Sequence, residues 1–361
     1  MITRILTIIL CFTFVLGFAG NPDRQGESGA GELLLNPWAR SAGFHSMNTS
    51  FIGGVESFRV NPAGIGRFNS NREIVVANTR LYEGSTLQLN GLGYAQKAKN
   101  GKGAFGVTMT NVNFGEIEIT TEDNPNGTGG TFSPSFFNIG VGYAHTYENK
   151  ISVGFLLRGI SENLTALSAF GLAVDAGVQY VSGTNDEFKL GISLRNVGTP
   201  MAFGGNALGV DRENGDIGNE YLINLENTSK SFELPSQLNI GASYDFYLKK
   251  TEDKDGNMIA NKNMFFTVLG NFTSNAFSRD QVGAGVEFTY RNIVQLRGAY
   301  KYEVGSNGVD GRENVYTGVS GGASFMFKLN KEGGTRLALD YAYRTTNPFR
   351  GTHNIGLRLM L

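Results

Sequence analysis

Cysteine is almost absent from this chain of 361 residues, and the only one, Cys11, lies in an apolar stretch near the N-terminus. The rest of the chain contains no thiol, which excludes disulfide scaffolds, cysteine metal sites and cysteine nucleophiles. Charge of one sign is also lacking, because 31 basic and 32 acidic residues leave a formal net charge of −1. Without a basic excess there is no reason to expect nucleic acid as a partner.

Histidine is equally scarce, and the three that occur, His45, His145 and His353, do not have the spacing of metal ligands. No combination of serine, histidine and acid suggests acyl transfer. We therefore expect no enzyme activity, no cofactor and no metal site.

One acidic stretch, "TEDKDGNM", resembles the middle of a calcium-binding EF-hand loop through Asp253 and Asp255. Such a loop needs an acid at its start and a glutamate at its end, where Thr251 and Lys262 stand. Asp and Asn before Gly form turns readily, so we interpret the stretch as a solvated turn.

Long apolar runs are missing except at the N-terminus. The basic start Met1–Arg4 is followed by the apolar stretch Ile5–Phe18, which ends in the small-residue pattern Gly17-Phe18-Ala19. This order is typical of a secretory signal peptide, and the run is too short to span a bilayer as a helix. We predict that residues 1–20 are a signal peptide, with a membrane anchor as the alternative.

Glycine is abundant, with 50 residues, and so are the aromatics, with 26 Phe and 14 Tyr. Stretches such as "HNIGLRLML" and "QVGAGVEFTY" alternate apolar and polar residues, a period of two that indicates strands rather than helices. About fourteen such segments can be counted: 72–82, 85–97, 102–113, 135–147, 150–162, 168–181, 186–197, 236–249, 262–273, 279–291, 293–302, 315–328, 335–345 and 352–361.

The chemistry of the second face of these strands distinguishes two all-β folds. A soluble sandwich would turn that face to water, whereas a transmembrane antiparallel β-barrel lines its lumen with it and turns the apolar face to lipid. Tyrosines near the ends of the apolar faces resemble interfacial girdles, so we predict an outer-membrane barrel, with a secreted sandwich or solenoid as the alternative. The charges that this register turns into the lumen have mixed signs, which favours cross-strand pairs: Arg158, Asp175, Lys189, Arg195, Asp245, Glu287, Arg297, Asp340 and Arg344.

An even number of strands places both the N- and C-termini in the periplasm. The connections on that side are then short, apart from "KTEDKDGNMIAN", and the long stretches 114–134, 198–235 and 303–314 face outward. This asymmetry is the one expected of bacterial barrels.

We divide the mature chain into an N-terminal segment, 21–70, and a barrel, 71–361. The segment is rich in glycine, and a barrel of this circumference has a lumen too wide for its wall side chains to fill, so we predict that the segment is an interior plug. Its elbow Asn61-Pro62-Ala63-Gly64 would turn the plug into the wall, because Pro fixes φ and Gly permits a tight corner. An ordinary turn before a strand is the alternative.

The stretches "NPWARSAGFHSM" and "NPAGIG", ahead of about fourteen strands, resemble the PorV/PorQ family of Bacteroidota outer-membrane proteins, which is related to the FadL-type long-chain fatty acid transporters. Phe44-His45 departs from the Met-Gly that the family favours. The positions that match the family motif are Ala39, Arg40, Ala42, Gly43, Asn61, Pro62, Ala63 and Gly64.

The resemblance implies an accessory of the type IX secretion system that binds a cargo signal or the translocon. One alternative is a FadL-like channel for hydrophobic compounds, and another is a barrel that binds a surface protein through its outer loops. Besides membrane lipid we therefore expect a protein partner. The candidate contact is the loop 198–235, which mixes apolar residues with acidic ones. The apolar candidates are Met201, Phe203, Leu208, Tyr221 and Leu222.

Overall fold

A computed structural model describes the chain over residues 20–99, 101–213, 222–252, 258–306, 311–330, 334–347 and 349–361. The predicted signal peptide therefore lies almost wholly outside the described residues, as do Asp253 and Asp255 of the acidic turn.

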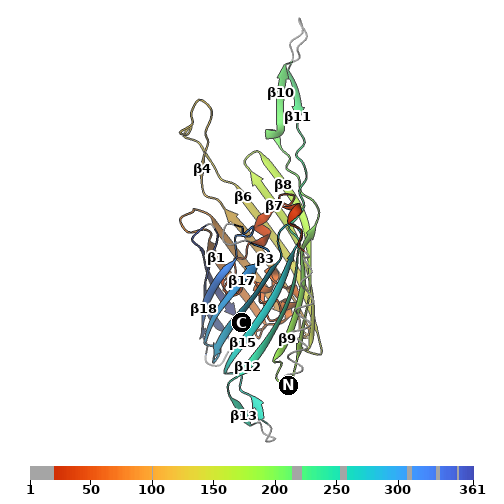
Figure 1. The fold of residues 1–361 in the computed structure, drawn as a ribbon, viewed down its shortest axis with the longest axis vertical. Coiled ribbons are helices and arrows are strands. Elements are labelled where there is room, and N and C mark those ends of the chain that lie inside the picture. Colours follow the sequence, from red (N-terminus) through yellow and green to blue (C-terminus); the bar gives the residue numbers. More distant parts are fainter. Residues whose placement is uncertain are drawn as a thin grey trace.

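Fourteen antiparallel strands form one closed barrel, in which each strand pairs with the next along the chain and β20 pairs with β1 (Figure 1). The predicted fold class and all fourteen predicted strands are confirmed. The barrel strands are β1 (Arg72–Arg80), β2 (Gln88–Lys97), β3 (Gly103–Asn113), β6 (Ser135–Tyr147), β7 (Ile151–Leu164), β8 (Leu167–Ser182), β9 (Phe188–Gly198), β12 (Gln237–Tyr247), β15 (Met264–Asn275), β16 (Gln281–Tyr290), β17 (Val294–Glu303), β18 (Gly318–Lys328), β19 (Arg336–Arg344) and β20 (Thr352–Met360).

The two faces of each barrel strand differ in chemistry as the alternation predicts. On β6, Val141 and Tyr143 point outward and are 56% and 50% exposed, whereas the glycines between and beside them face the interior. A continuous apolar outer face needs lipid as its solvent, which is the arrangement of an outer-membrane barrel. In the described chain no helix has the length and apolar character needed to cross a membrane.

Three small hairpins extend beyond the barrel. At one end lie β4 (Ile117–Glu118) with β5 (Thr131–Phe132), and the longer pair β10 (Gly209–Glu213) and β11 (Leu222–Glu226) (Figure 1). The pair β13 (Lys250–Glu252) and β14 (Met258–Ala260) lies at the other end. We name these the loop end and the turn end, since the remaining connections at the turn end are short.

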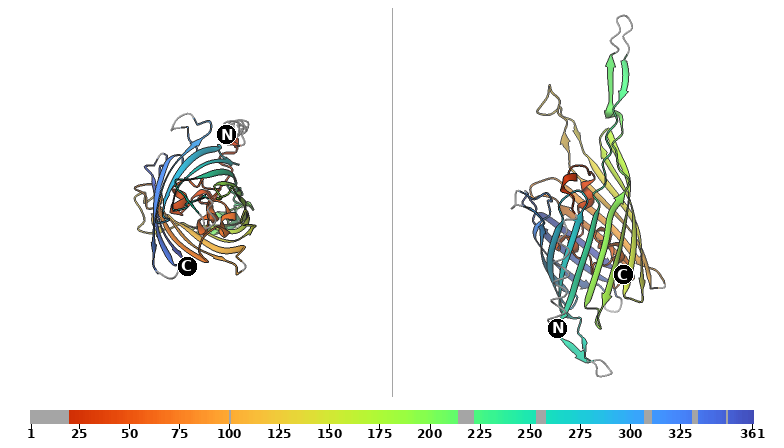
Figure 2. Two further views of the ribbon diagram at one scale, coloured as in Figure 1. Left: turned by 90° about the horizontal axis from the view of Figure 1, so that it is seen from below. Right: turned by 45° about the vertical axis from the view of Figure 1, so that its right-hand side comes forward.

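The N-terminal segment passes through the barrel from the loop end to the turn end. Gly20 N–H donates to Asp280, in the connection between β15 and β16 at the loop end (2.8 Å), whereas Asn71 N–H donates to the carbonyl of Leu361 at the turn end (2.9 Å). Figure 2 shows the segment inside the ring of strands. Gly20, the first described residue, therefore lies at the loop end and Leu361 at the turn end, and the expected periplasmic position of both termini stays a prediction.

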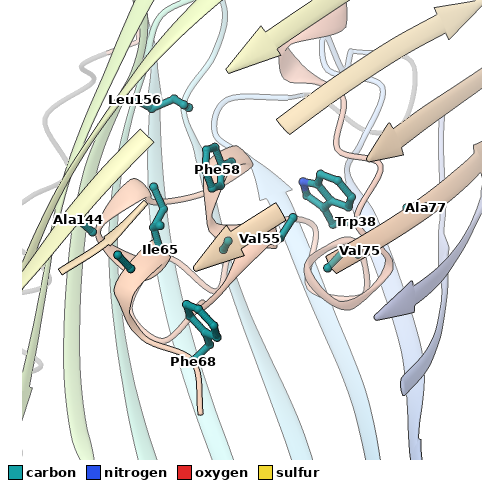
Figure 3. Close-up of a cluster of buried hydrophobic side chains, with 11 residues drawn as sticks. Trp38, Val55, Phe58, Ile65, Phe68, Val75, Ala77, Ala144 and Leu156 are labelled. Atoms are coloured by element: carbon teal, nitrogen blue, oxygen red, sulfur yellow. The ribbon is translucent and has the colours of Figure 1, made fainter. Parts of the chain in front are cut away.

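Within the plug the chain forms short helices, η1 (Pro22–Arg24), η2 (Gly31–Leu34), α2 (Ala39–Ala42), η3 (Val55–Arg59) and η4 (Pro62–Gly66). Helices this short are not stable alone and depend on the wall around them. The central apolar cluster joins plug and wall: Trp38, Val55, Phe58 and Ile65 of the plug pack against wall residues such as Leu156 (Figure 3).

Inward-facing glycines of the wall allow the plug backbone to contact the strands directly. A Cβ at Gly154 would lie 2.3 Å from the carbonyl oxygen of Pro62, and one at Gly191 would lie 2.3 Å from that of Thr49. Gly177 is equally restricted, because its Cβ would lie 2.0 Å from the Asn61 side chain. The glycine excess of the sequence thus has a structural cause, since larger residues at these points would push the plug away.

Exposure to lipid can be tested at Leu339, which is 44% exposed near the middle of β19. We expect Leu339→Arg to cost about 2–4 kcal/mol, because an arginine must then lie in the hydrocarbon near the midplane. Folding would be followed by heat-modified mobility of membrane extracts, with Leu339→Val as the control. Full assembly of Leu339→Arg would contradict the outward assignment of this face.

The tight plug contact can be tested with two glycines of β7. We expect Gly154→Ala to displace the plug at a cost of about 1–3 kcal/mol, because the methyl group would overlap the Pro62 carbonyl. Gly159→Ala is the matched control, since its Cβ would meet Ile139 at 3.5 Å and Phe170 at 3.9 Å, both ordinary contact distances. Limited proteolysis should cleave the plug faster in the first variant alone, and equal cleavage in both would show that close packing at Gly154 is unimportant.

Candidate functional site

The elbow lies inside the lumen rather than at the junction with β1, and it fixes the plug to the wall. Asn61 caps η4, since its Oδ1 accepts from the N–H of Ala63 (3.1 Å). Its amide group also donates to the carbonyls of Thr49 (3.0 Å) and Val178 (3.1 Å), joining two parts of the plug and strand β8. One side chain thus satisfies backbone groups on both plug and wall, which a simple turn before a strand would not require.

The other motif residues also hold the plug together. Ala39 is buried in α2, which packs on β18, β19 and β20. Arg40 donates to the carbonyl of Gly53 (2.6 Å) and forms an ion pair with Glu56 (3.6 Å). The carbonyl of Gly43 accepts from Ser320 (3.0 Å). Ala63 and Gly64 likewise accept hydrogen bonds through their carbonyls, from Ser152 of the wall (2.6 Å) and from Gly54 of the plug (2.9 Å).

All nine charged residues expected in the lumen lie on the inner face of the barrel. Eight wall residues form four ion pairs between neighbouring strands. Seven of these eight belong to the expected set, and Arg358 completes the fourth pair. The pairs are Arg158–Asp175 (2.7 Å), Lys189–Asp245 (2.5 Å), Glu287–Arg297 (3.2 Å) and Asp340–Arg358 (3.2 Å).

A β-bulge brings one of these pairs to the plug. The register of β8 with β9 shifts between Val174 and Ala176, so that Arg195 and Asn196 are both buried opposite Asp175. Asp175 then accepts from Asn196 N–H (2.6 Å) as well as from Arg158. Arg158 in turn donates to the carbonyl of Phe58 in the plug (3.2 Å). Alternation alone could not predict a bulge, because it interrupts the period of two.

A cavity of about 510 Å³ lies above this packed region, between the first part of the plug and the loop end of the wall. One wall of it is apolar and comes from β1 to β6, with the residues Leu81, Leu87, Val112, Phe114 and Phe136. Leu34 and Leu35 of the plug also line the cavity. A cavity of this size and character suits a small organic molecule.

Basic residues line another part of the same cavity, namely Arg195, Lys301 and Arg344. Arg344 lies 4.0 Å from the ring centroid of Tyr316, which belongs to the apolar wall. Within the described residues, none of these three cations forms an ion pair with a carboxylate. The cavity therefore places three basic side chains that form no ion pair in the described residues beside an apolar surface.

Two cavity groups of the plug and loops are neutral. Burial, together with Lys301 and Arg344, lowers the pKa of His45 well below its ordinary value, so the imidazole stays uncharged. Burial also raises the pKa of the Tyr82 phenol to about 12. The basic character of this side therefore comes from Arg195, Lys301 and Arg344 and not from the histidine.

An acidic pair faces the cavity where plug and wall meet. Glu32 of η2 and Glu162 of β7 are 6% and 4% exposed, and both line the cavity. Burial raises the pKa of the Glu32 carboxyl. Sequence reasoning missed both residues, because a single glutamate in a 3-10 helix or at a strand end has no recognisable pattern.

The candidate partner loop is divided between two environments. Met201 is fully buried rather than exposed, and it packs in an apolar cluster with Leu33 of the plug, against which Phe203 also packs. These side chains cover the barrel mouth, since an apolar loop base is more stable on the plug than in water. Leu208 is half-buried beside the β10–β11 hairpin, to which Leu222 belongs, and Tyr221 lies outside the described residues.

The packed plug leads to a prediction about conduction. We expect the intact protein to show little steady ion conductance in planar bilayers, because the apolar cluster of Figure 3 and the ion pairs fill the lumen. Deletion of residues 22–60 should raise the conductance, since the barrel closes through β1 and β20 without them. A large, stable conductance from the intact protein would contradict a plugged lumen.

Comparisons with known proteins agree with the architecture. No protein-family model and no curated protein sequence matches the chain. Among solved structures, it resembles the CymD monoaromatic hydrocarbon channel (TM-score 0.54, 14% identity, 90% of this chain and 97% of that one). It also resembles the Ralstonia pickettii toluene transporter TbuX (TM-score 0.51, 12% identity, 90% of this chain and 98% of that one). A Pseudomonas aeruginosa FadL homologue is similar as well (TM-score 0.46, 12% identity, 89% of this chain and 96% of that one). At these identities the likeness is one of fold: a closed barrel of fourteen strands, as in CymD and TbuX.

Proposed function

We propose that this protein is a channel for small, largely hydrophobic compounds that carry a negatively charged end, and that the 510 Å³ cavity is their entry site. The observation that carries the proposal is the position of three basic side chains beside an apolar wall in one cavity, none of which forms an ion pair in the described residues. An apolar body gains free energy by leaving water, and an anionic end is oriented by Lys301 and Arg344.

The structural neighbours support this function more than a role in secretion. CymD is a monoaromatic hydrocarbon channel and TbuX a toluene transporter, so two barrels of similar fold serve hydrophobic compounds. This chain shares their architecture and has an apolar cavity at the loop end. A charged ligand end would distinguish it from a channel for plain hydrocarbons.

A ligand would enter the main cavity from the loop end. A second cavity of about 180 Å³ adjoins the first and shares Leu34 and Gln237 with it. Gln25 and Gly26 at the start of the plug line this second cavity beside Ser278 of the β15–β16 connection. A ligand would reach the main cavity past the first residues of the plug, and its further passage requires the plug to move, because the apolar cluster below is closed.

The proposal can be tested by comparing decanoate with decanol as ligands of the purified barrel. We expect Lys301→Gln to weaken decanoate binding about tenfold or more, because a hydrogen bond to a charged group contributes about 1.5–3 kcal/mol. Decanol binding should stay unchanged in the same variant. Isothermal titration calorimetry measures both, and Arg350→Gln, an exposed loop-end substitution, is the matched control.

Two outcomes would contradict the proposal. If neither compound binds the intact protein, the cavity is not a site for such ligands. If Lys301→Gln and Arg350→Gln weaken decanoate equally, the cation acts through the general surface charge and not within the cavity.

A secretion accessory that binds protein is the second candidate, and the projecting β10–β11 hairpin is the feature that favours it (Figure 1). Leu225 on this hairpin is 44% exposed, unlike the buried Met201 at the loop base. Replacing residues 209–226 by a short Gly-Ser turn should leave assembly intact. Loss of a defined co-purifying translocon protein would support this candidate, and unchanged recovery would oppose it.

A further inference from the structure

Exposed charges are sorted between the two ends of the barrel. The exposed basic residues at the turn end come from nearly every connection there, and among the residues whose burial the structure describes, the acids with exposed side chains at this end are Glu148 and Asp186, the latter paired with Lys150. The exposed basic residues are Arg72, Lys99, Lys102, Lys150, Lys249, Lys262, Arg291 and Lys328.

The loop end has the opposite character. Its exposed basic residues in the described chain are Arg80, Lys230 and Arg350. Its exposed acids are Asp23, Glu27, Glu83, Glu116, Glu118, Glu122, Asp123 and Glu233. The formal net charge of −1 therefore hides a strong charge asymmetry along the barrel axis.

The turn-end cations lie at the border of the lipid-facing surface. Lys328 stands between Phe327 and Leu329, which are 55% and 58% exposed. Lys249 follows Leu248, which is 51% exposed, and Arg291 comes two residues before Ile293. These cations lie at the turn-end rim, next to residues at the depth where hydrocarbon gives way to headgroups, and we name them the basic ring. Alternation along β18 directs Lys328 away from the face of Phe327, so its long side chain reaches the headgroups over the rim.

We propose that this basic ring binds the phosphate groups of anionic phospholipid in the leaflet at the turn end. Lysine and arginine at the edge of a bilayer attract anionic headgroups, each contributing to retention of the lipid. Their apolar neighbours contact the acyl chains of the same molecules. A lipid therefore matches both parts of the surface, whereas an acidic protein would meet only the charged part.

One acid at this end belongs to the barrel's own contacts. Asp186 forms an ion pair with Lys150 (2.8 Å), and the Lys150 ammonium lowers the pKa of Asp186. Lys150 is therefore already paired with an acid of the barrel. The cations best suited to bind lipid are those flanked by exposed apolar residues. Lys249, Arg291 and Lys328 are the three that the structure places in this way.

The experiment compares two triple variants with the same change of charge. The first, Lys249→Gln with Arg291→Gln and Lys328→Gln, neutralises the turn end. The second, Arg80→Gln with Lys230→Gln and Arg350→Gln, neutralises the loop end. Each purified barrel is supplied with equal amounts of phosphatidylglycerol and phosphatidylcholine, and native mass spectrometry counts the lipids that it retains.

We expect the unchanged protein and the loop-end variant to retain phosphatidylglycerol preferentially, and the turn-end variant to lose about tenfold or more of that preference. Equal retention by both variants, or equal loss in both, would overturn the proposal. Should the turn-end triple fail to fold, Lys328→Gln against Arg350→Gln gives the same comparison with one charge each. The channel function does not enter this experiment, so the two proposals can fail independently.

Discussion

A barrel of fourteen strands has an interior that its own side chains do not fill, and the chain segment that fills it has a buried backbone. Every N–H and C=O group of that backbone needs a partner, since an unpaired buried polar group is costly. The wall supplies these partners in two ways. Ser152, Gln179 and Ser193 bond to plug carbonyls, and inward glycines let the plug approach closely enough to be bonded.

The same constraint explains the ion pairs of the lumen. Charges buried between wall and plug must be paired, because an isolated buried charge is strongly unfavourable. Arg158 meets this requirement through Asp175 and also donates to the plug at Phe58. Arg195, Lys301 and Arg344, which line the cavity, form no such ion pair within the described residues. This difference separates the paired charges of the lumen from the three basic residues that the proposed channel would use.

Plug and cavity together suggest how a closed barrel could still pass a compound. The lower plug is fixed by Asn61 and by the close glycine contacts, whereas the upper plug lines the cavity and bonds to the loop base through Gly29 and Glu233. A ligand in the cavity would therefore contact the part of the plug that fewer wall groups hold. The loop base that we expected to bind a partner instead covers this region, with Met201 and Phe203 packed on the plug.

The amino-acid sequence by itself determined the strands, their inward and outward faces and the mixed charges of the lumen. Each of these follows from the period of two, which is a local property that neighbouring residues express directly. It also marked Asn61 and Pro62 as a rigid elbow, because proline and its preceding residue are restricted wherever they occur.

Only the tertiary structure decided the rest. Closure of the barrel brought Lys301, Arg344 and the apolar wall into one cavity, although the contributing strands are far apart in the chain. The bulge at Asn196, the burial of Met201 and the sorting of exposed charges between the two ends likewise depend on which strands become neighbours and on where each connection lies. Such contacts join residues that are far apart in the chain. The alternation of apolar and polar residues cannot predict them, because the same alternation occurs in every strand.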